Sequence, residues 1–89
     1  MRGVKMEKID EAGVKLYMDG LGPAGIYVEA EPAPGWPGKF HVYVKIARKR
    51  YLVKTFVGQT KIFSPAAVIQ FANKFSANDV VFRYVPEQE

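Results

Sequence analysis

The sequence predicts a two-layer α+β domain in which one main helix covers a mostly antiparallel sheet of four to five strands. Several short segments alternate apolar and polar residues, as strands with one buried face do. One later segment carries an apolar stripe with helical spacing, and clusters of glycine and proline separate the segments. The expected order is β-β-β-β-α-β, and a chain of 89 residues fits a single domain.

The N-terminal part begins without a clear period. Residues 1–13 are interpreted as an arm or a short helix. Residues 14–19 alternate, with Val14, Leu16 and Met18 on one side, so the first strand is expected there.

Two breaks frame the second expected strand, residues 26–31. Residues 20–25 fit the pattern G-x-G-x-x-G, but they lead into a strand and not into a helix. A phosphate at this loop would lack a helix N-terminus, so no nucleotide or other cofactor is expected. Residues 32–38 hold three prolines and two glycines, which predicts a stiff loop with Trp36 near its tip.

The middle of the chain predicts a hairpin. Residues 40–47 give the clearest alternation, and residues 51–57 are rich in β-branched and aromatic residues. Between them, Arg48, Lys49 and Arg50 are expected at the turn. The sequence does not decide which side of the returning strand faces outward. That side holds either Lys54 with Leu52 and Phe56, or Tyr51 with Val53 and Thr55.

The helix is expected from Ser64 and Pro65 onward, because serine is a favourable N-cap and proline fits the first helical position. Residues 80–85 are the last expected strand, and residues 86–89 form an acidic tail. The predicted core joins the helix stripe to the middle strand: Val42, Val44, Ile46, Val68, Phe71 and Phe75.

Composition narrows the classes of function. The absence of cysteine excludes disulfides, thiolate zinc sites and a cysteine nucleophile. The N-terminus lacks the apolar core of a signal peptide, and no apolar run reaches the roughly 20 residues of a membrane span. We therefore expect a cytoplasmic protein without membrane contact.

The charges are unevenly distributed. Residues 32–78 contain no aspartate or glutamate but eight lysine and arginine residues. This block predicts a positive surface and an anionic partner. The alternative is a basic surface that serves solubility alone.

The outward faces of the expected strands, together with the loops, combine aromatic rings and cations. Rings can stack on bases while cations follow phosphates, which is the chemistry of single-stranded nucleic-acid binding, and we expect DNA here before RNA. The candidate binding residues are Lys15, Tyr17, Tyr27, Trp36, Lys39, His41, Tyr43, Lys45, Arg48, Lys49, Arg50, Lys54 and Phe56. Among them Tyr43, between two polar residues on the clearest strand, is the expected base platform.

Other interpretations remain open at this point. The same aromatic face fits a protein–protein or homodimer interface without any role in nucleic-acid binding. Trp36 either stacks on a ligand or folds back to anchor its loop. Catalysis is not expected, because His41 is the only histidine and has no acid near it in sequence. Glu29 and Glu31 share a strand face but are too few for a metal site.

The expected order of strands before one helix resembles that of the archaeal ThermoDBP-related proteins. So do basic and aromatic stretches such as Lys39-Phe40-His41-Val42-Tyr43-Val44-Lys45. The likeness covers residues 14–75 and involves no diagnostic motif. The resemblance implies single-stranded DNA binding in a groove of basic and hydrophobic residues. It assigns no contact residue to this chain.

Overall fold

A computed structural model describes residues 7–21, 25–46, 48–77 and 79–83. It confirms an α+β domain, adds a short first strand, and has a second helix in place of the strand expected at residues 14–19. The elements are β1 (Lys8–Ile9), α1 (Glu11–Leu21), β2 (Ile26–Pro32), β3 (Phe40–Ile46), β4 (Lys49–Val53), α2 (Pro65–Lys74) and β5 (Asp79–Phe82). Parts of the expected arm, of the 20–25 turn and of the last strand, and the whole acidic tail, lie outside the described residues.

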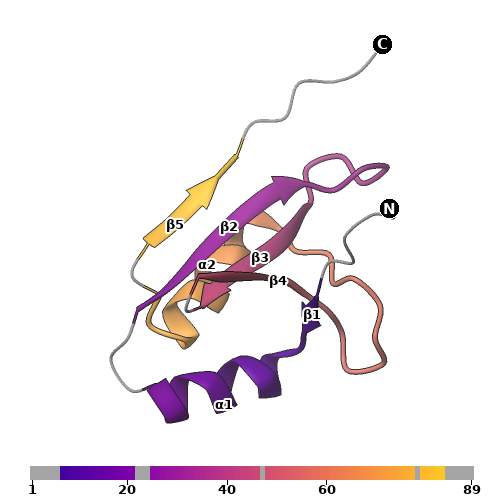
Figure 1. Ribbon diagram of the computed structural model, residues 1–89. Coiled ribbons are helices and arrows are strands. Elements are labelled where there is room, and N and C mark those ends of the chain that lie inside the picture. Colours follow the sequence, from indigo (N-terminus) through magenta and orange to yellow (C-terminus); the bar gives the residue numbers. More distant parts are fainter. Residues whose placement is uncertain (1–6, 22–24, 47, 78, 84–89) are drawn as a thin grey trace, which may run out of the picture.

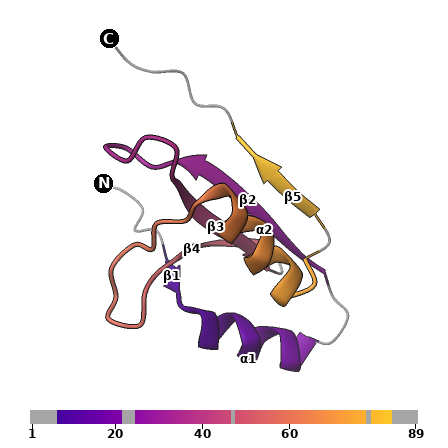
Figure 2. The same cartoon turned by 180° about the vertical axis from the view of Figure 1, so that it is seen from behind.

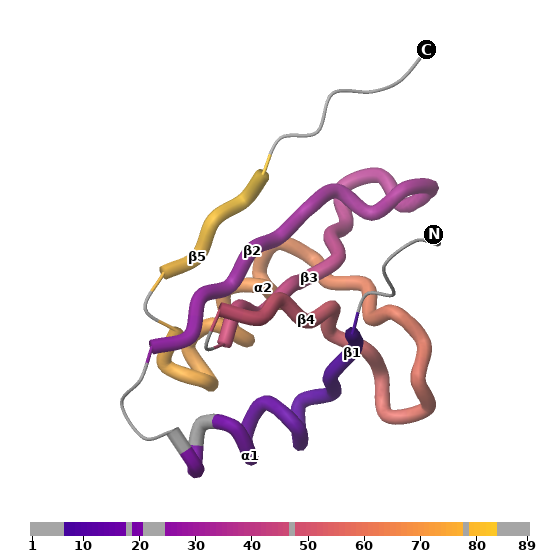
Figure 3. Tube along the Cα trace, in the orientation of Figure 1, coloured from indigo at the N-terminus to yellow at the C-terminus, as the bar shows by residue number. Residues whose placement is uncertain are grey.

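The five strands form one mixed sheet in the order β1-β4-β3-β2-β5 (Figures 1 and 3). Its centre is antiparallel, because short connections join β2 to β3 and β3 to β4. Both edges are parallel: β1 pairs with β4, and β5 pairs with β2. The expectation of a mostly antiparallel sheet thus holds only for the centre. The parallel edge strand β5 follows α2, as a helical crossover permits.

Helix α2 lies on one face of the sheet and Tyr17 of α1 contacts the same side, so no described helix covers the second face, which we call the open face. Helix α2 lies behind the strands in Figure 1 and in front of them in Figure 2. The predicted core is confirmed, because the six residues expected there are all buried in one cluster: Val42, Val44, Ile46, Val68, Phe71 and Phe75. The rings of Phe71 and Phe75 lie 4.9 Å apart between centroids.

The start of α2 is also as predicted. The Ser64 side chain accepts a hydrogen bond from the Ala67 amide at 3.1 Å, and Pro65 occupies the first turn. This cap satisfies an amide that the helix itself cannot pair.

The strand expected at residues 14–19 is wrong, because these residues lie inside α1. Asp10 starts the helix by accepting a hydrogen bond from the Gly13 amide at 2.8 Å. The alternation fails at Leu16, which is 72% exposed, whereas Val14 is fully buried. Tyr17 instead faces the helix-covered side of the sheet, where its hydroxyl lies 3.0 Å from that of Tyr51.

Gly13 is required for the packing of α1 on β1, and its low helix propensity also makes this helix hard to predict from the sequence. A Cβ at this position would lie 2.7 Å from Cγ1 of Ile9, so α1 packs closely on the end of β1 only with glycine there. Glycine within a helix costs roughly 1 kcal/mol relative to alanine. Local propensity therefore argued against a helix that tertiary packing stabilises.

The loop between β2 and β3 consists of two successive proline–glycine turns. The Trp36 amide donates to the Ala33 carbonyl, and the Lys39 amide donates to the Trp36 carbonyl. Gly35 and Gly38 have φ angles of 80° and 74°, as the third position of a type II turn requires. The predicted loop is confirmed over residues 33–39, whereas Pro32 ends β2, and Trp36 is exposed at the junction of the two turns.

The two ends of β4 differ from the prediction. Lys49 and Arg50 belong to the strand itself, and Ile46 pairs with Lys49, so of the three expected turn residues only Arg48 lies in the turn. The strand ends at Val53, after which Thr55–Gln59 form a tight turn with Gly58 at φ 97°. Phe56 is 91% exposed at its tip.

Candidate functional site

The open face of the sheet is ordered in rows, because neighbouring strands place their outward residues side by side. Tyr51 and Val53 are buried, which assigns Arg50, Leu52 and Lys54 to the open side of β4 and its continuation. The first row holds Asp79, Tyr27, Lys45 and Arg50; the second holds Val81, Glu29, Tyr43, Leu52 and Lys8. Glu31 faces His41 in the third row.

An ion-pair network occupies the centre of this face. Arg50 on β4 donates through Nε to Glu29 at 3.0 Å and through a terminal nitrogen to Glu31 at 2.8 Å. To reach β2, its side chain crosses Tyr43, and its Cζ lies 3.8 Å from the centroid of that ring. Arg83 approaches the same two carboxylates at 3.4 and 3.8 Å.

Burial and the charges of the network together shift the pKa values of three residues on this face. Burial alone would raise the pKa of Glu29, but hydrogen bonds from Arg83 and Arg50 outweigh burial and lower it. Burial lowers the pKa of His41, against the opposing charge of Glu31. Burial raises the pKa of Tyr43, helped by Glu31 and opposed by Arg50. The carboxylate of Glu29 is thus ionised and held in place at neutral pH.

Stability should therefore fall in acid. Glu29 and Glu11 both have pKa values below the ordinary 4.5, the latter through hydrogen bonds from Lys74 and Lys61. A lowered folded-state pKa means that the ionised form stabilises the fold. This contribution is complete above pH 4.5 and is lost as the pH falls through the folded-state values. Urea denaturation between pH 7 and pH 3 measures it.

The variant Glu29→Gln should lose roughly 1–3 kcal/mol of unfolding free energy at pH 7, because two arginines lose a charged acceptor. Its difference from the wild type should shrink towards pH 3. The control Asp19→Asn changes an exposed carboxylate of α1 and should keep the wild-type acid dependence. An equal loss in both variants at pH 7 would contradict a structural role for the network.

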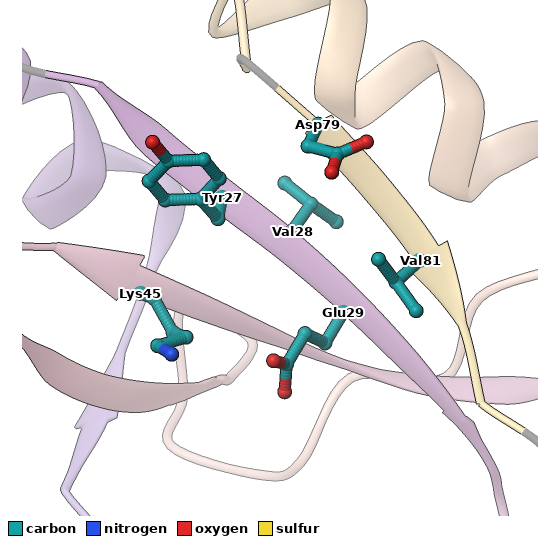
Figure 4. A pocket seen from close by; sticks show the side chains of 6 residues that line it. All are labelled: Tyr27, Val28, Glu29, Lys45, Asp79 and Val81. Atoms are coloured by element: carbon teal, nitrogen blue, oxygen red, sulfur yellow. The ribbon is translucent and has the colours of Figure 1, made fainter.

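Beside the network lies a shallow hollow of about 260 Å³. Figure 4 shows the residues around it: Tyr27, Val28 and Glu29 from β2, Lys45 from β3, and Asp79 and Val81 from β5. The Tyr27 ring is 47% exposed, and Lys45 stands directly opposite it on β3. This end of the sheet offers an aromatic ring beside a cation that forms no ion pair within the described part of the chain, with the carboxylates of Glu29 and Asp79 also in the lining.

The structure brings six of the candidate residues together on the open face: Tyr27, His41, Tyr43, Lys45, Arg50 and Lys54. Lys15 and Tyr17 are misplaced in the prediction, since they belong to α1 and Tyr17 contacts the helix-covered side. Lys49 follows the alternation of Tyr51 and not that of Arg50.

The remaining candidates lie at the ends of the molecule. Trp36 and Lys39 are in the loop at one end of β3, and Arg48 is in the turn at its other end. Phe56 is at the tip of a separate turn.

The basic block is partly neutralised by acids from outside it. Half of its eight cations form ion pairs: Lys49 with Glu7, Arg50 with Glu29 and Glu31, and Lys61 and Lys74 with Glu11. Within the described ranges, Lys39, Lys45, Arg48 and Lys54 have no ion pair. The positive surface is therefore smaller than the sequence block implies.

Asp79, Val81 and Arg83 were missing from the sequence prediction of the site. They lie next to Tyr27 and Glu29 because β5 pairs in parallel with β2, a long-range contact without a local signal. Glu29 and Glu31 were visible as a pair on one face, but their arginine partners were not. Among the described residues, no three histidine or acidic side chains gather as a metal site.

Comparisons with family models, curated proteins and solved structures found no match to the chain. No helix in the described part of the chain has the length and apolar character needed to cross a membrane.

Proposed function

We propose that the chain binds single-stranded nucleic acid, DNA in the first instance, at the hollow beside Tyr27. The observation that carries this proposal is the exposed Tyr27 ring, which lies in a hollow of the open sheet face. Lys45 stands opposite it and has no ion pair among the described residues. A base can stack on an exposed tyrosine regardless of its sequence. The neighbouring ammonium then meets the phosphate of the same strand.

The hollow suits a single strand better than a duplex. Helix α2 covers the opposite face of the sheet, and α1 contacts that same side through Tyr17, so neither described helix is presented at this surface for the major groove. A splayed single strand, in contrast, can place one base in a shallow hollow.

The charged residues that line the hollow are Lys45, Glu29 and Asp79, and the turn after β3 adds the cation of Arg48. Lys45 is exposed in the first row, and Arg48 is exposed in the turn that follows β3. Arg50 is already neutralised by Glu29 and Glu31, so it contributes little to phosphate binding. We expect about two phosphate contacts, which corresponds to a log–log salt slope of about −1.4 for a single strand.

A titration of labelled single-stranded oligonucleotides at several salt concentrations tests this expectation. Lys45→Ala should weaken binding and reduce the slope by about 0.7, because one phosphate contact is lost. Lys74→Ala is the matched control: it removes the same charge from α2, on the opposite face of the sheet, where Lys74 pairs with Glu11.

The outcomes separate the candidate functions. Absence of binding at low salt would overturn the proposal and favour a protein-interaction module without nucleic-acid binding. Equal effects of the two lysine variants would mean that binding does not involve the open face.

A further inference from the structure

Strand β5 leaves an open edge of the sheet. It is the last strand in the sheet order, with β2 on one side and no described strand on the other (Figure 3). The Arg83 amide donates to the Ala30 carbonyl at 2.8 Å. Because peptide groups alternate along a strand, those of Val80 and Phe82 point away from β2. The outer edge therefore presents backbone donors and acceptors.

The side chains of β5 remain partly uncovered. Val81 on the open face is 44% exposed, and Phe82 on the helix-covered face is 42% exposed although its ring packs edge-on against Phe40. Natural sheets usually protect an edge strand with charges, proline or a covering loop. Here the only edge protection within β5 is Asp79, whose carboxylate accepts from the Val80 amide at 3.0 Å.

The charges of this edge are self-complementary. Asp79 lies two residues before Val81, and Arg83 lies two residues after it. In an antiparallel pair centred on Val81, each Asp79 would stand opposite the partner's Arg83. In the same register the outward peptide groups of Val80 would meet those of the partner's Phe82, which gives hydrogen bonds on both sides of the centre.

We propose that β5 pairs antiparallel with β5 of a second copy of this chain, with Val81 on the two-fold axis, to form one continuous sheet. On pairing, Asp79 releases the Val80 amide to the partner strand and turns to the partner's Arg83. Because a strand of four residues buries little area, the dimer is weak and depends on concentration. Asp79 and Val81 also line the hollow, so two hollows would lie next to each other across the axis.

A single cysteine tests this arrangement, because the chain contains none. Val81 would form a non-hydrogen-bonded pair with its symmetry mate, with Cα atoms about 4.5 Å apart. That separation permits a disulfide. On mild oxidation, Val81→Cys should give a disulfide-linked dimer on the order of tenfold faster than Val57→Cys. Val57 is more exposed but lies in the turn that carries Phe56, away from β5.

A double variant assigns any cross-linking to the strand edge. Adding Val80→Pro to Val81→Cys removes the outward amide and should lower the rate to that of Val57→Cys. Circular dichroism checks that each variant remains folded. The proposal is overturned if Val81→Cys links no faster than Val57→Cys, or if the proline leaves its rate unchanged. Neither readout needs nucleic acid, so the result is independent of the proposed function.

Discussion

Replacing Arg50 with alanine should lower the unfolding free energy by about 2–3 kcal/mol. The guanidinium holds two carboxylates of β2 and covers Tyr43 on β3, so it joins three strands across the open face. Its loss would leave the Glu29 side chain, only 11% exposed, with the single longer contact from Arg83 at 3.4 Å. Denaturation in urea at pH 7 measures the loss.

The matched control is Arg48→Ala. It removes the same charge from the same hairpin, but Arg48 is exposed and has no ion pair in the part of the chain that the structure describes. A surface change of this kind usually stays within about 0.5 kcal/mol. Equal losses in the two variants would contradict the view that Arg50 links the strands. The sequence predicts the same phosphate-binding role for both arginines, whereas the structure gives them different environments.

The largest expected effect on binding is that of Tyr27→Ala. Loss of a stacked base should cost roughly 1–3 kcal/mol, or about a 5- to 150-fold rise in Kd for a single-stranded oligonucleotide. The salt slope should not change, because the ring neutralises no phosphate. Tyr27→Phe retains the ring face and should bind as the wild type does.

Tyr43→Ala serves as the comparison. The sequence alone favours Tyr43 as the base platform, but Arg50 covers one face of its ring and the side chain is half-buried. We therefore expect Tyr43→Ala to cost less binding free energy than Tyr27→Ala, provided that circular dichroism shows a folded variant. A larger loss for Tyr43→Ala would place the ligand over the middle row and contradict a site at the hollow.

The charge pattern along the sequence overestimates the positive charge of the folded surface. The acid-free stretch contains eight cations, yet in the folded chain half of them form ion pairs with Glu7, Glu11, Glu29 or Glu31. Sequence distance hides these pairs, since Glu11 and Lys74 are 63 positions apart. The hydrogen bonds on Glu29 and Glu11 therefore belong to the stability of the fold and not to the binding of an anion.

The sequence by itself determined the elements whose signals are local. Helix α2 follows from its serine cap and its stripe of Val68 and Phe71, and β3 follows from strict alternation. The stiff loop around Trp36 follows from its two proline–glycine pairs, because these residues fix the backbone angles that a type II turn requires.

Only the tertiary structure decided the rest. Helix α1 contains two glycines, and its first turn is fixed by the close packing of Gly13 on Ile9, which a local pattern does not record. The parallel pairing of β5 with β2, and the path of Arg50 over Tyr43 to Glu29, join residues that are distant in sequence. Alternation assigns a side chain to a face, but its neighbours on that face depend on strand order and register. For this reason the sequence identified the aromatic and basic face, whereas the fold selected Tyr27 as its exposed ring and placed Arg50 in the network.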